Sequence, residues 1–173
     1  MMERAFTEIR MKSLRTFTFL LWILAGATLA ASAQAALKIE NGSQQASVSL
    51  NSLKTMPHMT GTVHNPHTNA DETYSGVPLL ELLKQVGAPV GHDVHGKALS
   101  EYIVATGSDG YKAVLALAEV EPDFHPGDVL VADAMDGKPL DAKSGPFKLV
   151  VTEDKRPARS VHNLVSVELK AAE

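Results

Sequence analysis

The chain has 173 residues, of which 45% are hydrophobic and 21% charged, and it contains no cysteine. The absence of thiols excludes disulfides, iron–sulfur clusters and every thiol-based mechanism. A formal net charge of −4 and an aromatic content of 5% argue against nucleic acid and an anionic membrane surface as main partners.

The first 35 residues have the three-part pattern of a secretory signal peptide. Lys12 and Arg15 precede an apolar run from Phe17 to Ala30, and small residues at 33–35 offer a cleavage site. Met11 is a candidate true start, because the segment from there has the more usual length. The apolar run is short for a bilayer span, so we favour cleavage over an uncleaved membrane anchor. We therefore expect a periplasmic or secreted protein with no stable membrane anchor after cleavage.

Cleavage after Ala35 leaves residues 36–173 as a single module, which is long enough to bury a hydrophobic core. Four of the 16 basic and two of the 20 acidic residues lie in the first 35, so the module has a formal charge of −6. Without disulfides, its stability depends on packing.

Most of the module is predicted to consist of short strands. After a polar leading segment at 36–45, runs that are apolar, or that alternate apolar and polar residues, indicate extended structure. These runs lie at 46–50, 60–64, 72–75, 102–105, 112–116, 129–132, 147–152 and 165–170. The polar stretch 65–71 contains Pro66 and is predicted to be a loop.

Helices are predicted to be few. Pro78 suits the first position of a helix, apolar residues follow over 79–86, and Gly87 ends it. A short helical turn is predicted at 118–121. Many short strands with few short helices indicate an α+β fold, here a single compact domain of mixed β-sheets.

Glycines are interpreted as turn residues. Asp109-Gly110 lies between two apolar runs and predicts a hairpin, because glycine tolerates a positive φ angle. Gly76, Gly137 and Gly145 are assigned to turns for the same reason.

Four turn-and-strand segments follow one another in a characteristic order. They are Tyr74-Ser75-Gly76-Val77-Pro78-Leu79, Asp109-Gly110-Tyr111, Asp136-Gly137-Lys138-Pro139-Leu140 and Gly145-Pro146-Phe147-Lys148-Leu149-Val150-Val151. In this order and spacing, the chain resembles the oxidoreductase molybdopterin-binding domain of the sulfite oxidase family, over most of the module. The resemblance implies a sulfite oxidase-like fold, and it identifies the chain as a small, exported, cysteine-free relative.

The resemblance also implies where a cofactor would lie. In the family, molybdenum is held by a pterin dithiolene and one protein thiolate, and counting back along this chain places that thiolate near His64. Because this chain has no cysteine, thiolate-ligated molybdenum is not expected, although molybdopterin remains a candidate cofactor. The family's phosphate contacts are basic residues near the end of the domain, where this chain has a basic loop. The candidate cofactor-binding residues are His64, His67, Arg156, Arg159 and His162.

The histidines suggest a different site. His64 and His67 form a His-x-x-His pair, and His58 is one strand away. Neutral imidazoles bind zinc or copper, so His58, His64 and His67 form a candidate metal site. Solvated loop histidines are the alternative, and His92 and His95 form a second cluster of the same kind.

Three functions remain open from the sequence. The first is a periplasmic binding or accessory module that holds a small anionic ligand or a pterin near loops 58–71 and 154–162. The second is a molybdopterin-dependent oxidoreductase whose metal lacks a protein thiolate. The third is a zinc- or copper-binding protein that uses the histidine loops.

Overall fold

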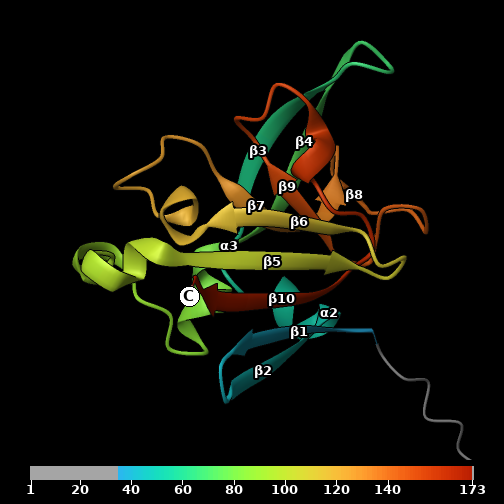
Figure 1. The fold of residues 1–173 in the computed structure, drawn as a ribbon. Coiled ribbons are helices and arrows are strands. Elements are labelled where there is room, and N and C mark those ends of the chain that lie inside the picture. Colours follow the sequence, from blue (N-terminus) through green and yellow to red (C-terminus); the bar gives the residue numbers. More distant parts are fainter. Residues whose placement is uncertain (1–34, 173) are drawn as a thin grey trace, which may run out of the picture. The chain divides into compact units, whose positions relative to one another are not determined.

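Ten β-strands, arranged as two five-stranded sheets, account for most of the secondary structure in the computed structural model, which describes residues 35–172 (Figure 1). The first sheet has the order β2-β1-β10-β5-β6. Its strands are β2 (Gln44–Ser49), β1 (Ala36–Asn41), β10 (Leu164–Ala171), β5 (Glu101–Gly107) and β6 (Lys112–Ala116). All its pairs are antiparallel except β1 with β10.

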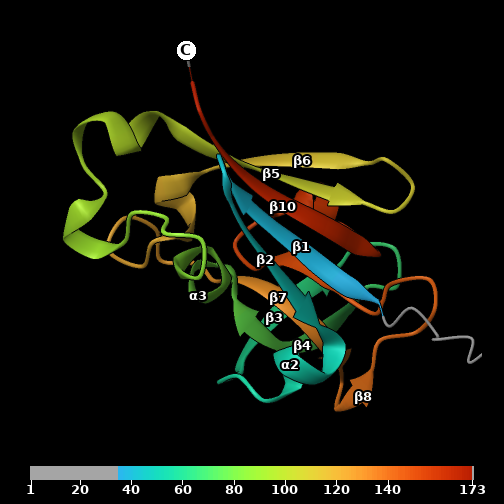
Figure 2. The same ribbon diagram turned by 90° about the horizontal axis from the view of Figure 1, so that it is seen from below.

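The second sheet has the order β3-β4-β7-β8, and β9 also pairs with β7. Its strands are β3 (Met59–Asn65), β4 (Ala70–Pro78), β7 (Val129–Met135), β8 (Lys138–Pro139) and β9 (Lys148–Val151). All its pairs are antiparallel. Figure 2 shows the two sheets as two layers.

Within residues 35–172, two short α-helices and four 3-10 turns connect the strands. The helices are α2 (Leu50–Lys54) and α3 (Leu79–Lys84). The 3-10 turns are η1 (Gly91–Asp93), η2 (Gly96–Ser100), η3 (Leu117–Val120) and η4 (Pro157–Arg159). None of the helices among residues 35–172 has the length and apolar character needed to span a bilayer.

The main hydrophobic core lies between the sheets. Helix α3 contacts β1 of the first sheet and both β4 and β7 of the second, and its leucines are buried, as the apolar face at 79–86 predicted. A smaller cluster forms from alternate residues of β3, β4, β7 and β9, which point away from the main core: Val63, Tyr74, Leu130, Ala132 and Val150. The second sheet therefore has apolar side chains on both faces.

The fold class is confirmed: the described residues form one domain of mixed β-sheets with few short helices. The hairpin at Asp109-Gly110 joins β5 to β6, and Gly110 has a φ of 84°. The predicted signal peptide, with its possible start at Met11, lies almost wholly outside the described residues.

The prediction of a polar leading segment at 36–45 is wrong. Residues 36–41 form β1, which lies inside the first sheet between β2 and β10. Leu37 and Ile39 alternate with polar neighbours and are fully buried. Two alternating apolar residues are too few to reveal a strand within a polar stretch of sequence. They are nevertheless enough to bury one face of a strand that pairs with a neighbour on each side.

Gly76 is not a turn residue, which is a second correction. It lies within β4, at a shift of register opposite β7. A Cβ atom at Gly76 would contact the Val131 carbonyl oxygen and would lie 2.5 Å from the Ala132 Cα atom. Glycine is required here because the two strands approach closely, not because the backbone turns.

Candidate ligand-binding cavity

A cavity of about 790 Å³ lies on the face of the second sheet that carries the smaller cluster. Its walls come from the β3–β4 hairpin, from β9 and from the segments 141–144 and 157–162. Figure 1 shows the segment after β9 beside this hairpin. The volume is within the range of about 300–1,000 Å³ that is usual for small-molecule sites.

A chain of hydrogen bonds crosses the cavity wall. Lys148 donates from Nζ to the Tyr74 hydroxyl oxygen at 2.5 Å, and Tyr74 donates to Glu72 Oε2 at 2.6 Å. Asn65 Nδ2 donates to the other Glu72 oxygen at 2.6 Å. Strand alternation places Glu72 and Tyr74 on one face of β4, and β9 brings Lys148 to the same face. The four side chains are therefore held in fixed positions by two strands and the hairpin.

Lys148 is a buried cation. Its relative exposure is 6%, and its ammonium also lies 4.3 Å from the centre of the Tyr74 ring. Burial lowers the pKa of Lys148, whereas the negative charges of Glu72 and Asp141 act in the opposite direction. Partial desolvation of the ring and the Lys148 charge also lower the pKa of His162. His162 is therefore a neutral imidazole at pH 7.

The two acidic partners respond in opposite ways. Burial would raise the pKa of Glu72, but hydrogen bonds from Tyr74 and Asn65, together with the Lys148 charge, outweigh it and lower the pKa. Burial, followed by the hydrogen bond to Glu72, raises the pKa of Tyr74. Glu72 is thus a carboxylate and Tyr74 a neutral phenol at neutral pH.

The cavity lining has unused donors beside two carboxylates, Glu72 and Asp141, and Asp141 Oδ1 already accepts from the Lys143 and Ser144 N–H groups. Lys148 has three N–H donors and no acceptor, and its one hydrogen bond within residues 35–172 goes to Tyr74. Ser160 Oγ accepts from the Val151 N–H, which leaves its own proton to donate. The Glu72 oxygens already accept from Tyr74 and Asn65. A ligand that presents acceptor atoms, such as a carboxylate, phosphate or carbonyl, suits this arrangement.

The structure places three of the five candidate cofactor-binding residues on this cavity. His64 and His67, from the β3–β4 hairpin, line it together with His162, which lies far away in the sequence. His64 is exposed, and its Nδ1 lies 2.9 Å from Asp71 Oδ1. Whether these residues contact a cofactor stays a prediction.

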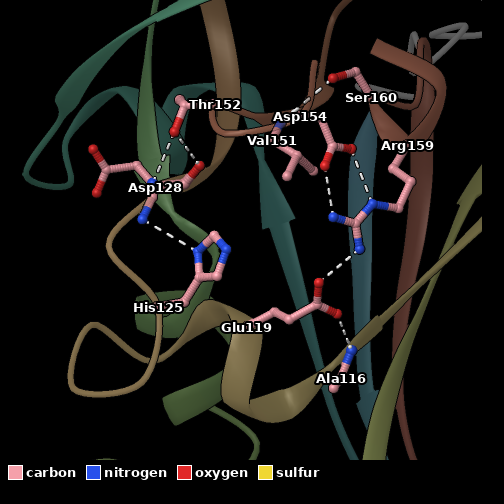
Figure 3. Close-up of polar contacts among 10 residues, drawn as sticks. Ala116, Glu119, His125, Asp128, Val151, Thr152, Asp154, Arg159 and Ser160 are labelled. Carbon is pink, nitrogen blue, oxygen red and sulfur yellow. Dashed lines mark hydrogen bonds and ion pairs between the residues drawn. The ribbon is translucent and has the colours of Figure 1, made fainter. Parts of the chain in front are cut away.

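The two arginines do not line the cavity. Arg159 binds Asp154 through Nε and Nη2, at 2.9 and 2.6 Å, and binds Glu119 Oε1 through Nη1 at 2.7 Å (Figure 3). Glu119 also accepts a hydrogen bond from the Ala116 N–H. These contacts join η4 to η3, so Arg159 has a structural task and is not directed at a ligand. The phosphate-binding role expected for Arg156 and Arg159 finds no support in this geometry.

The candidate metal ligands are not brought together either. His58 Nδ1 lies 2.8 Å from the Met56 carbonyl oxygen, and its Nε2 lies 3.3 Å from Asp133 Oδ1. Among residues 35–172, no group of three or more histidine, aspartate or glutamate side chains is arranged to hold a metal ion. His58, His64 and His67 therefore do not form one site here, and His92 and His95 lie apart from the cavity lining.

Sequence reasoning missed the central residues of the cavity, Lys148, Tyr74 and Glu72. Lys148 carried a signal, because it is the one charged residue in the apolar run 147–151. Glu72 and Tyr74 are two positions apart in a strand and therefore share a face. Which face is buried, and which strand lies beside it, depends on the sheet order.

The chain belongs to the family described as the oxidoreductase molybdopterin binding domain, whose model matches residues 27–173. A similar solved structure is the sulfane dehydrogenase SoxCD from Paracoccus pantotrophus, with a TM-score of 0.61 and 20% sequence identity. The match covers 80% of this chain but 39% of that chain, so this protein spans well under half of its structural relative. At this identity the likeness establishes the fold. No curated protein matches the sequence.

The family implies molybdopterin, and the residues of the cavity fit that cofactor only in part. The volume and the donor groups suit an anionic pterin. A bond to molybdenum has no suitable donor, because the chain has no cysteine and imidazole is a poor replacement for thiolate at a high-valent metal. The protein therefore offers no suitable bond to the metal-bearing part of the cofactor.

Proposed function

We propose that this protein is a periplasmic binding or accessory module that holds a small anionic ligand or a pterin in the cavity, and that it is not a complete oxidoreductase. The buried Lys148 ammonium, which keeps unused N–H donors on the cavity surface, carries this proposal. Neutral His162 and the Ser160 hydroxyl add donors on the segment after β9. The lack of a thiolate supports the accessory role over redox catalysis at a metal.

The second candidate is a molybdopterin-dependent oxidoreductase without a protein thiolate ligand. Membership of the family favours it. In that case the cofactor supplies the chemistry, and the protein contributes binding and orientation.

Metal and pterin analysis of protein purified from its native compartment separates the two candidates. The binding-module proposal predicts molybdenum far below one atom per chain. Molybdenum close to one per chain, together with pterin fluorescence after oxidation, would instead establish the oxidoreductase. Zinc or copper near one atom per chain would support a metal site formed by His58, His64 and His67.

Ligand binding is tested with pterin-6-carboxylate, a fluorescent pterin that carries an acid group. We expect Lys148→Met to weaken binding by about 10-fold or more, because hydrogen bonds to charged groups contribute about 1.5–3 kcal/mol. Methionine retains the length of the side chain, and Tyr74 keeps its bond to Glu72, so the variant is expected to fold. The matched control is Lys97→Met, which removes an exposed lysine in η2. Equal affinity for all three proteins would refute the site.

A neutral pterin provides the second arm of this test. With 6-hydroxymethylpterin, which lacks the acid group, the wild-type protein is expected to bind more weakly than with pterin-6-carboxylate. If the neutral compound binds equally well, the cavity does not select for an anion.

A further inference from the structure

We propose that Lys148 is a covalent attachment point, whose amine condenses with an aldehyde or ketone group of a ligand in the cavity to form an imine. This inference rests on the proposed function, because it takes the cavity to be the ligand site. It narrows the ligand to small compounds that carry both a carbonyl group and an acid group.

The environment of Lys148 is unusual for a lysine of this protein. Lys38, Lys84 and Lys170 are at least two-fifths exposed, and each pairs with a glutamate. Lys148 is 6% exposed, and among residues 35–172 no carboxylate oxygen lies within ion-pair distance of its Nζ. A buried ammonium without a direct counter-charge loses its proton more readily than an exposed one. Buried lysines of this kind serve as Schiff-base nucleophiles.

The position of the amine also suits the reaction. Strand β9 directs the flanking residues Phe147 and Leu149 into the main core, so Lys148 points to the opposite face and lines the cavity. The hydrogen bond to Tyr74 holds Nζ in place at the cavity wall. A carbonyl compound in the cavity would therefore meet an amine that is already oriented. Such pre-orientation of the reacting groups supplies much of the rate enhancement of enzymes.

Tyr74 and Glu72 provide a route for the proton. The Lys148 ammonium gives a proton to the Tyr74 oxygen while Tyr74 passes its own proton to Glu72 Oε2, along the two hydrogen bonds described above. The free amine then attacks the carbonyl carbon, a C–N bond forms, and the carbonyl π electrons move to oxygen.

The second half of the reaction returns the proton. Transfer of one amine proton to the new oxygen gives a neutral carbinolamine. Glu72 sends the stored proton back through Tyr74 to the hydroxyl group, which leaves as water while the nitrogen lone pair forms the C=N bond. The sum is ammonium plus carbonyl giving protonated imine plus water, and no oxidant, reductant or metal is consumed.

The acid group of such a ligand also finds partners. Ser160 and His162 line the same cavity from the segment that follows β9, and Lys143 lines it from the segment before β9. Each of these residues can donate a hydrogen bond to an oxygen atom. An acid group held there would leave the carbonyl end free to reach Lys148.

The test uses glyoxylate, the smallest aldehyde acid, with borohydride to reduce any imine to a stable secondary amine. We expect one carboxymethyl group per chain, located on Lys148 by peptide mass mapping, with labelling at least tenfold faster than that of exposed Lys97. Lys148→Arg keeps the positive charge but cannot form an imine, so its labelling at this site should vanish. Circular dichroism of each variant confirms folding.

A second variant probes the proton route. Tyr74→Phe removes the hydroxyl group that links Lys148 to Glu72. Because positioned acid–base groups typically contribute about 10²-fold or more, labelling of Lys148 should become slower by about that factor while the labelling of Lys97 stays unchanged. An unchanged rate at Lys148 would refute the relay.

The outcomes separate this inference from the proposed function. If pterin-6-carboxylate binds in a Lys148-dependent manner but glyoxylate labels only exposed lysines, the imine is refuted and the binding module stands. If glyoxylate labels Lys148 selectively while pterin-6-carboxylate does not bind, the imine is supported and the pterin ligand is refuted. If glyoxylate labels the lysines of folded wild-type protein only in proportion to their exposure, the inference is overturned.

Discussion

The close approach of β4 to β7 at Gly76 predicts a large effect of one added methyl group. In Gly76→Ala, the new Cβ would lie 2.5 Å from the Ala132 Cα atom and 2.7 Å from the Ala132 nitrogen, and would also contact the Val131 carbonyl oxygen. These are backbone atoms of a strand that pairs with β9 on its other side. Relief of the contact therefore requires a shift of β7 itself, and a rotamer change is not enough.

The expected cost follows from this geometry. Overpacking that side chains can absorb costs about 1–3 kcal/mol. Because backbone must move here, we expect a loss of about 3 kcal/mol in the free energy of unfolding, which corresponds to a fall in Tm of about 10 °C. Ala132 pairs with Lys148 in the sheet, so the same shift should weaken the binding of pterin-6-carboxylate.

Urea denaturation followed by far-UV circular dichroism measures the effect. Tryptophan fluorescence is unsuitable, because the only tryptophan is Trp22, which lies before the predicted cleavage site. Ser75→Ala, which changes the neighbouring half-buried position of β4, is the matched control and should cost less than about 1 kcal/mol.

Gly76→Asn decides between a packing and a turn explanation. Asparagine tolerates the left-handed backbone region better than alanine does, so a glycine needed for a turn would accept asparagine best. The close approach of two strands predicts the reverse, with asparagine at least as damaging as alanine. A stability of Gly76→Ala within about 1 kcal/mol of wild type, or an asparagine variant more stable than the alanine variant, would show that β4 and β7 do not approach closely at this position.

Three further predictions concern other parts of the molecule. Ile39→Ala should cost about 2–5 kcal/mol in urea denaturation, because Ile39 is fully buried in β1; a loss below about 1 kcal/mol would contradict a central β1. Glu119→Gln should cost about 1 kcal/mol of stability at pH 7, because it removes the charge that pairs with Arg159. Burial alone would raise the pKa of Glu119, but the hydrogen bond from Arg159 outweighs this effect and lowers the pKa. A carboxyl group whose pKa is lowered in the folded state stabilises the fold at any pH above its pKa in the unfolded state. The difference in stability between wild type and Glu119→Gln should therefore shrink as the pH falls from about 5 to 3. A difference that does not depend on pH would refute the ion pair. Tyr74→Phe should cost about 1–3 kcal/mol in thermal unfolding, since it deprives buried Lys148 of its hydrogen-bond acceptor; a more stable variant would show that the bond is unimportant.

Much of the local structure was readable from the residues alone. Pro78, the leucines after it and Gly87 predicted α3, and Asp109-Gly110 predicted the β5–β6 hairpin, because helix signals and tight-turn signals depend on neighbours in the chain. The ordered motifs from Tyr74 to Val151 also predicted the family, which the match over residues 27–173 confirms.

The candidate site was readable only in part. His64, His67 and His162 were singled out from the sequence, and they line one cavity. Arg159 was chosen for its charge, but in the structure its guanidinium group pairs with Asp154 and Glu119, which are 5 and 40 positions away in the sequence. A sequence reveals that an arginine can bind an anion, whereas the fold decides which anion is nearest.

The residue types and their spacing by themselves determined most of the strands, the turn between β5 and β6, the helix α3 and the absence of any thiol chemistry. The tertiary structure alone decided that 36–41 forms an inner strand, that Gly76 lies where two strands nearly touch, and that Lys148 meets Tyr74 from 74 positions away. The physical reason is the same in each case. Hydrogen-bonding preference and periodicity act over a few residues, whereas burial and charge pairing depend on which strands become neighbours in a sheet.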